Sequence, residues 1–496
     1  METKLVLHSQ FPIGEVSPLI FGGFLEHLGR SIYTGVYDPD SAHADGEGMR
    51  QDVIEALREL EMTIVRYPGG NFASGYHWRD GVGPRESRPT VRELAWQSLE
   101  PNTFGTDEFV NLCRKVGWQP MIAVNLGTGS PEELFIRLRD WVEYCNSPIG
   151  TRYADERAAN GSADPFDVPI WCLGNEMDGP WQLGHVPADQ YGIRAQQAAK
   201  MMKDCDRSIA TVACGSSGSQ MPTFLEWDRQ VLEHLGDLAD YVSLHRYVGN
   251  RDGNSVDYLA ISNSIDRQIE AVDACTRLVA EQRRASSRAW LCFDEWNVWY
   301  RARGQGGGRG TIAPPLLEER YNLEDALVVA MFLMSFIRHA DCVKIANLAQ
   351  LVNVIGPVMT RGDELFKQTI FHAFRMISSR KTGVSLRGAV VGPRYTSERY
   401  GEVAYLDHAA MLDGDRLHVF AVNRSLDEDL RLSVELDRSI AKVVDAEILH
   451  AELQAENDFD APDRVSSAPF DGWLVQGSAE AVLPPHSFTA TTFALR

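Results

Sequence analysis

The chain has 496 residues, of which 44% are hydrophobic, 24% charged and 9% aromatic, and this ordinary globular composition excludes a disordered or collagen-like chain. Asp and Glu number 69 against 48 Lys and Arg, a net charge of −21; because this charge repels phosphate backbones and anionic lipids, we expect neither a nucleic-acid nor a membrane partner. The eight cysteines form no CxxC pair and no signal peptide is apparent at the N-terminus, so we expect a cytoplasmic protein with reduced thiols.

Short apolar runs alternate with longer amphipathic segments from about residue 19 to residue 380, which is the rhythm of a parallel βα sheet. Ser130-Pro-Glu-Glu133 is a capping sequence and predicts the start of one helix. Strands are predicted at residues 19–25, 63–67, 121–125, 170–174, 210–215, 241–245, 290–294 and 342–346. The other helices are predicted at residues 49–61, 106–116, 188–204, 223–235, 258–284, 322–338 and 365–378.

Eight strands are the number that closes a barrel, so the sequence predicts an α/β fold built on a (β/α)8 TIM barrel. An open doubly wound sheet shares the rhythm, but such a sheet usually carries a GxGxxG loop after its first strand. The segment GGFLEHLG (22–29) is not such a loop. The glycine-rich stretch at residues 304–310 is expected to form a mobile loop after the seventh strand.

After about residue 385 the pattern changes to short alternating strands, which indicates a C-terminal β-sandwich of jelly-roll type. Residues 4–8 also read as a strand, and we expect them to join this domain. The predicted domains are therefore a barrel at 17–384 and a β-sandwich at 1–16 plus 385–496. Strands of the second domain are predicted at residues 403–406, 409–412, 417–422, 430–436, 443–449 and 488–495.

Catalytic residues of a (β/α)8 barrel project from the C-terminal ends of its strands. Two glutamates hold such positions, Glu176 after the fourth predicted strand and Glu295 after the seventh. Strands four and seven lie apart around the ring, so the two side chains can converge across its mouth. Facing carboxylates are what glycoside hydrolysis needs, one as proton donor and one as nucleophile or base. Each glutamate alone could equally be a helix cap or a rim carboxylate.

Other side chains at the strand ends suit a sugar ligand. Polar candidates at these positions are Glu26, Arg66, Asn71, Asn175, His245 and Gln350, and aromatic candidates are Tyr247, Trp181, Trp296 and Trp299. The aromatic side chains could instead plug the barrel, and a lone Asn often only makes a turn. The histidines show neither HxH nor HExxH spacing, which favours hydrogen bonding over metal binding. We expect no metal and no cofactor.

At these residues the sequence resembles the α-L-arabinofuranosidases of glycoside hydrolase family 51. The matching segments are GGFLEHLGRSIYTGVYDP (22–39), RYPGGNFASGYHWRDGVGPR (66–85), FGTDEF (104–109), WCLGNEMDGPWQLGH (171–185), SLHRY (243–247), DEWNVWY (294–300) and NLAQLVNVIGP (347–357). The resemblance implies a (β/α)8 barrel with a β-sandwich, a retaining mechanism and release of terminal arabinofuranose from hemicellulose-derived chains. It also suggests a homohexamer.

Carried over residue by residue, the resemblance implies that Glu176 is the acid/base and Glu295 the nucleophile. Residues that match those holding the furanose are Glu26, Asn71, Asn175, Tyr247 and Gln350. We add Arg66, His245 and Trp296 as substrate-binding candidates because they stand at the same strand ends. His77 replaces the Asn of the family's GYNW motif, which puts acceptor preference in doubt but not the chemistry.

Two alternatives remain open at this point. A related retaining glycosidase, such as a galactofuranosidase, a β-xylosidase or an endo-glucanase, would keep both glutamates and change the pocket lining. A non-catalytic sugar-binding barrel would keep the aromatic side chains and lose one glutamate, and both glutamates are present.

Overall fold

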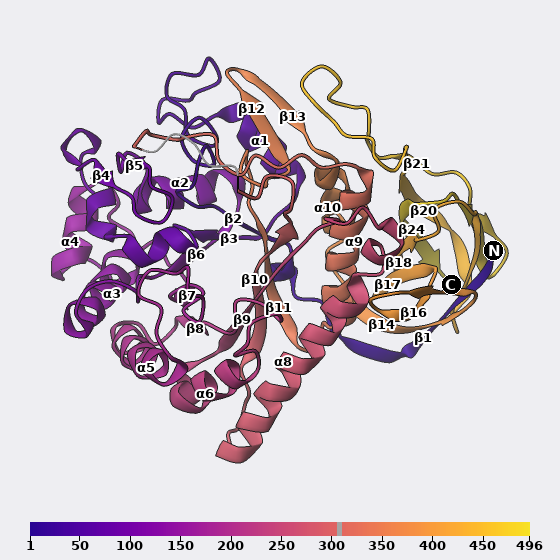
Figure 1. Ribbon diagram of the computed structural model, residues 1–496, viewed down its shortest axis with the longest axis horizontal. Coiled ribbons are helices and arrows are strands. Elements are labelled where there is room, and N and C mark those ends of the chain that lie inside the picture. The colour runs from indigo at the N-terminus through magenta and orange to yellow at the C-terminus, as the bar shows by residue number, and fades with distance from the viewer. Residues whose placement is uncertain (305–309) are drawn as a thin grey trace.

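The computed structural model describes residues 1–304 and 310–496, so most of the predicted loop at 304–310 lies outside the described residues. Eight parallel strands close a barrel in the order β10-β11-β2-β3-β6-β7-β8-β9, seen on the left of Figure 1. In chain order they are β2 (Gly22–Phe24), β3 (Ile64–Tyr67), β6 (Gln119–Ala123), β7 (Ile170–Leu173), β8 (Ala210–Ala213), β9 (Tyr241–Val248), β10 (Trp290–Val298) and β11 (Val343–Ala349). Each overlaps a predicted strand, which confirms the barrel.

Helices surround the barrel where the sequence predicts them, and two short helices are additional. They are α1 (Gln51–Glu59), α2 (Thr106–Val116), α3 (Pro131–Asn146), α4 (Arg152–Ala159), α5 (Ala188–Cys205), α6 (Glu226–Leu235), α7 (Ser255–Tyr258), α8 (Ser262–Arg283), α9 (Leu323–Arg338) and α10 (Thr369–Ser378). The Ser130 hydroxyl accepts from the backbone N–H of Glu133, as the capping sequence predicts. Helix α4 was not predicted, because its short polar sequence buries only Tyr153, Ala154 and Arg157.

The second domain, on the right of Figure 1, is one ten-stranded sheet in the order β21-β20-β24-β18-β17-β14-β1-β19-β23-β22. It curls until its ends meet, since the backbone N–H of Ile440 donates to Gly477 O at 2.9 Å. Its strands are β1 (Glu2–Glu15), β14 (Val384–Val391), β17 (Leu406–Asp413), β18 (Arg416–Asn423), β19 (Leu430–Glu435), β20 (Ile440–Leu449), β21 (Ala468–Pro469), β22 (Leu474–Val475), β23 (Ala479–Leu483) and β24 (Ser487–Leu495). Three hairpins lie outside both sheets, namely β4 (Val91–Arg92) with β5 (Leu99–Glu100), β12 (Val358–Arg361) with β13 (Glu364–Lys367), and β15 (Arg394–Ser397) with β16 (Gly401–Ala404).

The N-terminal strand belongs to this second sheet, as the sequence predicts. Strand β1 pairs antiparallel with β14 and parallel with β19, so both chain termini lie in the same domain (Figure 1). Division of the chain at residues 16/17 and 384/385 stays a prediction.

Helix α9 fills the space between the barrel and the second sheet. All its residues except Arg338 are buried, and it contacts both β10 and β17. A helix that is apolar all round is expected in such a core position. Among the described residues, no helix is both long enough and apolar enough to cross a bilayer.

Candidate active site

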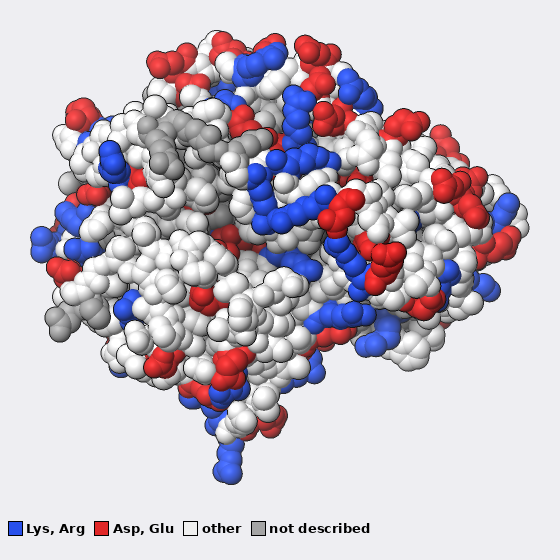
Figure 2. Space-filling view, in the orientation of Figure 1, with Lys and Arg blue, Asp and Glu red and all other residues white. Residues whose placement is uncertain are grey.

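The C-terminal ends of the barrel strands surround a pocket of about 830 Å³, a size typical of small-molecule sites. Figure 2 shows it as a hollow with acidic atoms at its base. Predicted site residues that line the pocket are Glu26, Asn71, Glu176, Trp181, His245, Tyr247, Glu295, Trp299 and Gln350. Arg66 and Asn175 lie buried behind this wall, and His77 is exposed beside Arg137, away from the pocket.

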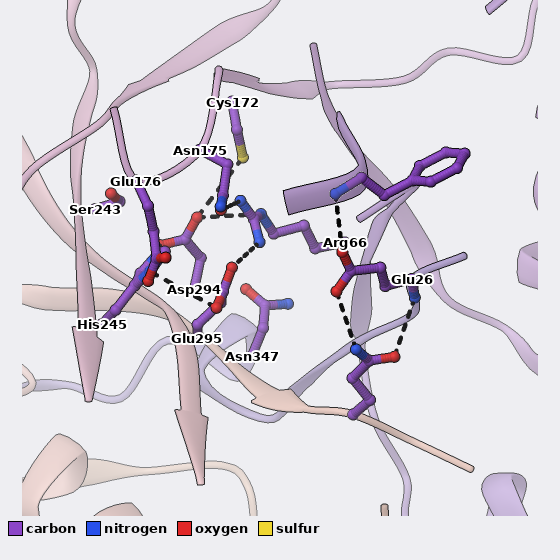
Figure 3. A network of polar contacts seen from close by, with 12 residues as sticks. Glu26, Arg66, Cys172, Asn175, Glu176, Ser243, His245, Asp294, Glu295 and Asn347 are labelled. Carbon is purple, nitrogen blue, oxygen red and sulfur yellow. Dashed lines mark hydrogen bonds and ion pairs between the residues drawn. The ribbon is translucent and has the colours of Figure 1, made fainter. Parts of the chain in front are cut away.

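The two glutamates converge on one histidine (Figure 3). His245 Nδ1 lies 2.9 Å from Glu176 Oε1 and 3.7 Å from Glu295 Oε2. One carboxylate oxygen of each glutamate and a ring nitrogen of His245 all lie within 4.8 Å of one another. Glu176 follows β7 with a φ of 43°, a left-handed conformation uncommon for a residue other than glycine and often found at functional sites.

Glu295 is held from several sides. Arg66 Nη1 donates to Glu295 Oε1 at 2.8 Å, and the Tyr247 hydroxyl donates to Oε2 at 2.9 Å. Burial raises the pKa of Glu295, while the charges of His245 and Arg66 oppose that rise. Gly70 lies so close that a side-chain Cβ there would come within 2.8 Å of Glu295 Oε1. The carboxylate is therefore fixed in one orientation with little free space around it.

A β-bulge in β10 lets two consecutive acidic residues point into the barrel. Along β10 the step from Cys292 to Glu295 matches only two residues on β9, from Ser243 to His245. Bulges of this kind redirect side chains and often lie next to active sites. Asp294 consequently reaches Arg66 Nε at 3.2 Å and His245 Nε2 at 3.3 Å.

The same bulge turns Trp296 away from the pocket, where the sequence analysis had expected it. Trp296 is fully buried and does not line the pocket. Its ring packs outside the barrel against Phe332 of α9 at 5.0 Å and near Phe374 of α10 at 6.4 Å. Trp296 is thus a packing residue of the core, and the expectation that it binds substrate is not supported.

The charges of Asp294 and Glu295 are balanced by two buried cations. Burial disfavours a charged imidazole, but Glu295 and Asp294 outweigh it and raise the pKa of His245 well above its usual value. Burial likewise disfavours ionised Asp294, but Arg66 and His245 outweigh it and lower the pKa of Asp294. Buried ion pairs persist when such partners compensate for lost water. Arg66 and His245 therefore hold the acidic base of the pocket together.

A chain of amides continues behind Arg66. Arg66 Nη2 donates to Asn175 Oδ1 at 2.8 Å, Asn175 Nδ2 donates to Gln182 at 3.2 Å, and Gln182 donates to Ser74 at 2.6 Å. This chain fixes the strand end that carries Glu176, since Asn175 directly precedes it. The substrate-binding role of Asn175 stays a prediction.

Glu26 forms a second polar group on the other side of Arg66 (Figure 3). Its carboxylate accepts from the Phe72 backbone N–H at 3.0 Å, from Trp96 Nε1 at 3.1 Å and from Gln350 Nε2 at 3.1 Å. Burial, together with the charge of Glu295, raises the pKa of Glu26 to about 8. A carboxyl group in this state can donate a hydrogen bond as well as accept one, which suits a sugar hydroxyl.

Sequence reasoning missed two contributors to this site. Trp96 lies between strands β4 and β5, in a polar stretch without a motif, yet it lines the pocket and donates to Glu26. Asp294 was noted only as a strand-end residue, and its pairing with Arg66 and His245 depends on the bulge.

Two groups of side chains among the described residues could hold a metal ion by proximity. One is Glu176, His245 and Glu295, and the other is His339, Asp341 and Cys342. In the first group His245 Nδ1 already contacts Glu176, and the carboxylates are the ones that glycoside chemistry uses. In the second group the Cys342 Sγ donates to the His339 carbonyl oxygen, and burial raises the pKa of Cys342 to about 12, which disfavours a thiolate ligand.

Comparison with known proteins decides the family. Residues 56–265 match the family model described as "Alpha-L-arabinofuranosidase 1 domain", and residues 294–487 match "Alpha-L-arabinofuranosidase C-terminal domain". The chain is also 45% identical over 441 residues, 88% of its length and 87% of the relative's, to an intracellular exo-α-(1→5)-L-arabinofuranosidase of Halalkalibacterium halodurans. The chain belongs to the α-L-arabinofuranosidases of glycoside hydrolase family 51.

Other family members are similar along the whole chain. An exo-α-(1→6)-L-arabinofuranosidase of Bifidobacterium longum is 40% identical over 99% of this chain and 97% of its own. Among solved structures, a family 51 α-L-arabinofuranosidase from Bifidobacterium longum superposes with a TM-score of 0.94 at 37% identity and 99% coverage of both chains. The arabinose complex of the Thermotoga maritima enzyme gives 0.88 at 32% identity, over 99% of this chain and 100% of that one.

Proposed function

We propose that the protein is a retaining exo-α-L-arabinofuranosidase that releases terminal non-reducing arabinofuranosyl residues from arabinose-containing oligosaccharides such as arabinoxylan and arabinan fragments. The observation that carries this proposal is the pair Glu176 and Glu295, with carboxylate oxygens within 4.8 Å of each other. Carboxyl groups about 5–5.5 Å apart are typical of retaining glycosidases, whereas inverting enzymes need about 6.5–9.5 Å for a water molecule. The names of the family relatives support the sugar and the exo mode.

In the first step Glu176 donates a proton to the departing oxygen while Glu295 attacks the anomeric carbon, giving a covalent arabinosyl-enzyme. Contacts of Glu295 support its role as nucleophile, because Arg66 and Tyr247 orient its oxygens. Glu176 is the more exposed of the two side chains, 11% against 7%, which suits a group that exchanges protons with the leaving group and with water.

In the second step the ionised Glu176 removes a proton from water, and the water displaces Glu295 from the sugar. Protons and charges then return to their starting positions. Glu26, Asn71 and Gln350 are assigned to the furanose hydroxyls, since all three line the pocket. The chemistry requires only these side chains and water, and no cofactor has a task in it.

The cellular location and the oligomeric state of the protein are also proposals. Relatives from Halalkalibacterium halodurans and Bacillus subtilis are named intracellular, which supports a cytoplasmic location for this chain. A homohexamer is proposed from the family resemblance.

A panel of nitrophenyl glycosides tests the proposed activity. We expect the α-L-arabinofuranoside to be cleaved about 100-fold or more faster than the β-D-xylopyranoside and the β-D-galactofuranoside, because a pocket built to pair with each hydroxyl of one sugar rejects its analogues strongly. Proton NMR of the first product should show the α-anomer. Initial release of the β-anomer would contradict the retaining mechanism, and preference for another glycoside would contradict the sugar.

Independence from metal is a second expected result. Because acid/base and nucleophilic roles are both filled by carboxyl groups, incubation with a chelator followed by gel filtration should leave kcat/KM for the aryl arabinofuranoside unchanged. Loss of activity that a divalent ion restores would contradict the metal-free mechanism.

A further inference from the structure

Arginine side chains surround the outer part of the pocket. Those that line it are Arg246, Arg251, Arg303 and Arg399. Figure 2 shows Lys and Arg side chains along one side of the hollow, outside the acidic atoms at its base. Since the chain has 69 acidic and 48 basic residues, an arginine on its surface would be expected to find a carboxylate, and Arg399 does so by pairing with Asp252.

The other three arginines have no ion-pair partner among residues 1–304 and 310–496. Arg303 is exposed, donates through Nε to the Trp299 carbonyl oxygen at 3.0 Å, and covers the Trp299 ring with its Cζ 4.2 Å from the centroid. Arg251 is exposed in the loop after β9. Within the described part of the chain, Arg246 donates only to the neutral oxygens of Ser219, Ser264 and Gln268.

Arg251 and Arg303 also act on each other. Partial desolvation and the positive charge of Arg251 both lower the pKa of Arg303. Two like charges that repel each other at a pocket mouth destabilise the empty site, and a bound anion would offset that repulsion.

Arg303 lies on the side of the pocket that Tyr247 and Trp299 form. Tyr247 donates to Glu295, the Trp299 ring packs edge-on against Tyr247 at 5.4 Å, and Arg303 covers Trp299. Arg303 is thus two aromatic rings away from the reacting carboxylate. A sugar that is attached to the bound furanose and extends along this side of the pocket would contact these arginines.

We propose that the pocket mouth selects an aglycone that carries a carboxylate, namely a hexuronic acid residue of an acidic oligosaccharide, bound by Arg251 and Arg303 with added positive charge from Arg246. The inference rests on the proposed function, because it names the substrate class of the same site. The planar guanidinium group pairs with a carboxylate through two parallel hydrogen bonds. The positive charge of these arginines would act against the net charge of −21, which alone would repel an acidic substrate.

The test compares two disaccharides, α-L-arabinofuranosyl linked to methyl glucopyranosiduronate and the methyl ester of the same compound. We expect wild-type kcat/KM to be about fivefold to tenfold higher for the acid than for the ester, and this acid/ester ratio to fall in 1 M salt. Arg251→Gln and Arg303→Gln should each lower the ratio about threefold to tenfold. Thermal denaturation checks that both variants fold as the wild type does.

Arg207→Gln is the matched control, because Arg207 is exposed and precedes β8 at the opposite end of the barrel. It removes the same charge and should leave the acid/ester ratio unchanged. A wild-type ratio of one or less, or a ratio that neither pocket variant lowers, overturns the inference and leaves the proposed function intact.

Failure of the proposed function has a different signature, since no arabinofuranoside would then be cleaved. In that case a measurement of ligand binding tests the inference. NMR titration with methyl β-D-glucopyranosiduronate and methyl β-D-glucopyranoside should show preferential binding of the acid, weakened by Arg251→Gln. Equal binding of the two glycosides overturns the inference.

Discussion

Glu176→Ala is expected to regain turnover of aryl arabinofuranosides when azide is added, with α-L-arabinofuranosyl azide as the product. An aryl leaving group with a low pKa needs little protonation, so Glu295 can still form the covalent intermediate in this variant. Azide needs no base and can enter the space that the glutamate side chain vacates. Two successive inversions return the anomer of the substrate. Without azide, turnover of a natural oligosaccharide should fall about 10²–10⁴-fold.

Glu295→Ala should behave differently, because no intermediate can form without its carboxylate. Activity should fall about 10⁴-fold or more, and azide could attack only the substrate itself, a single inversion that gives the β-azide. NMR of the glycosyl azide therefore reports the role of each glutamate. The α-azide from Glu295→Ala together with the β-azide from Glu176→Ala would reverse the assignment, and no rescue of either variant would leave both roles without support.

The barrel could be predicted from sequence because its strands are buried on both faces and therefore read as short apolar runs. Sequence patterns that mark where a helix begins can also be recognised, as the capping box at Ser130 shows. Strand ends then point to the site without knowledge of side-chain geometry, since the C-terminal ends of all barrel strands meet at one mouth. Glu176, Glu295 and Glu26 were found in this way, and all three line the pocket.

Contacts that depend on register or on distant loops could not be predicted. A strictly alternating β10 would place Asp294 and Glu295 on opposite faces, and the bulge that brings both inward adds one residue without any turn signal in the sequence. Trp296 was predicted to bind substrate from its place at the strand end, and strict alternation along β10 would point its side chain into the barrel, whereas the bulge turns it outward. Trp96 contacts a glutamate 70 positions away, and no local pattern encodes such a contact.

Arg66→Met is expected to destabilise the protein and to remove most of its activity. The Arg66 side chain is 1% exposed and pairs with Asp294 and Glu295, so its loss leaves two buried carboxylates with His245 as their one counter-charge among the described residues. Breaking a buried pair by removing one partner typically costs about 3–5 kcal/mol. By contrast, Arg79→Met removes the exposed pair with Glu156 and should cost about 1 kcal/mol or less. Chemical denaturation of both variants gives the comparison.

The pH dependence of the Arg66→Met variant follows from the same charges. Without Arg66 the folded-state pKa values of Asp294 and Glu295 should both lie higher than in the wild type, because Arg66 lowers each of them. Between the lower pKa values of the wild type and the higher ones of the variant, the folded variant therefore binds more protons than the folded wild type. Relative to the wild type, the stability of the variant should then fall as pH rises. The deficit relative to wild type is expected to be larger at pH 8 than at pH 5.

The pH profile of activity of the Arg66→Met variant should shift to higher pH. Because Glu295 must be ionised to attack, the acidic limb of kcat/KM against pH should move to higher pH, and the maximum should fall about 100-fold or more as the carboxylate loses the donor that orients it. A stability deficit that is equal at pH 5 and pH 8, with an unmoved acidic limb, would show that Arg66 acts by packing alone. In that case its position over the Phe24 ring, 4.7 Å from the centroid, would be the contact that matters.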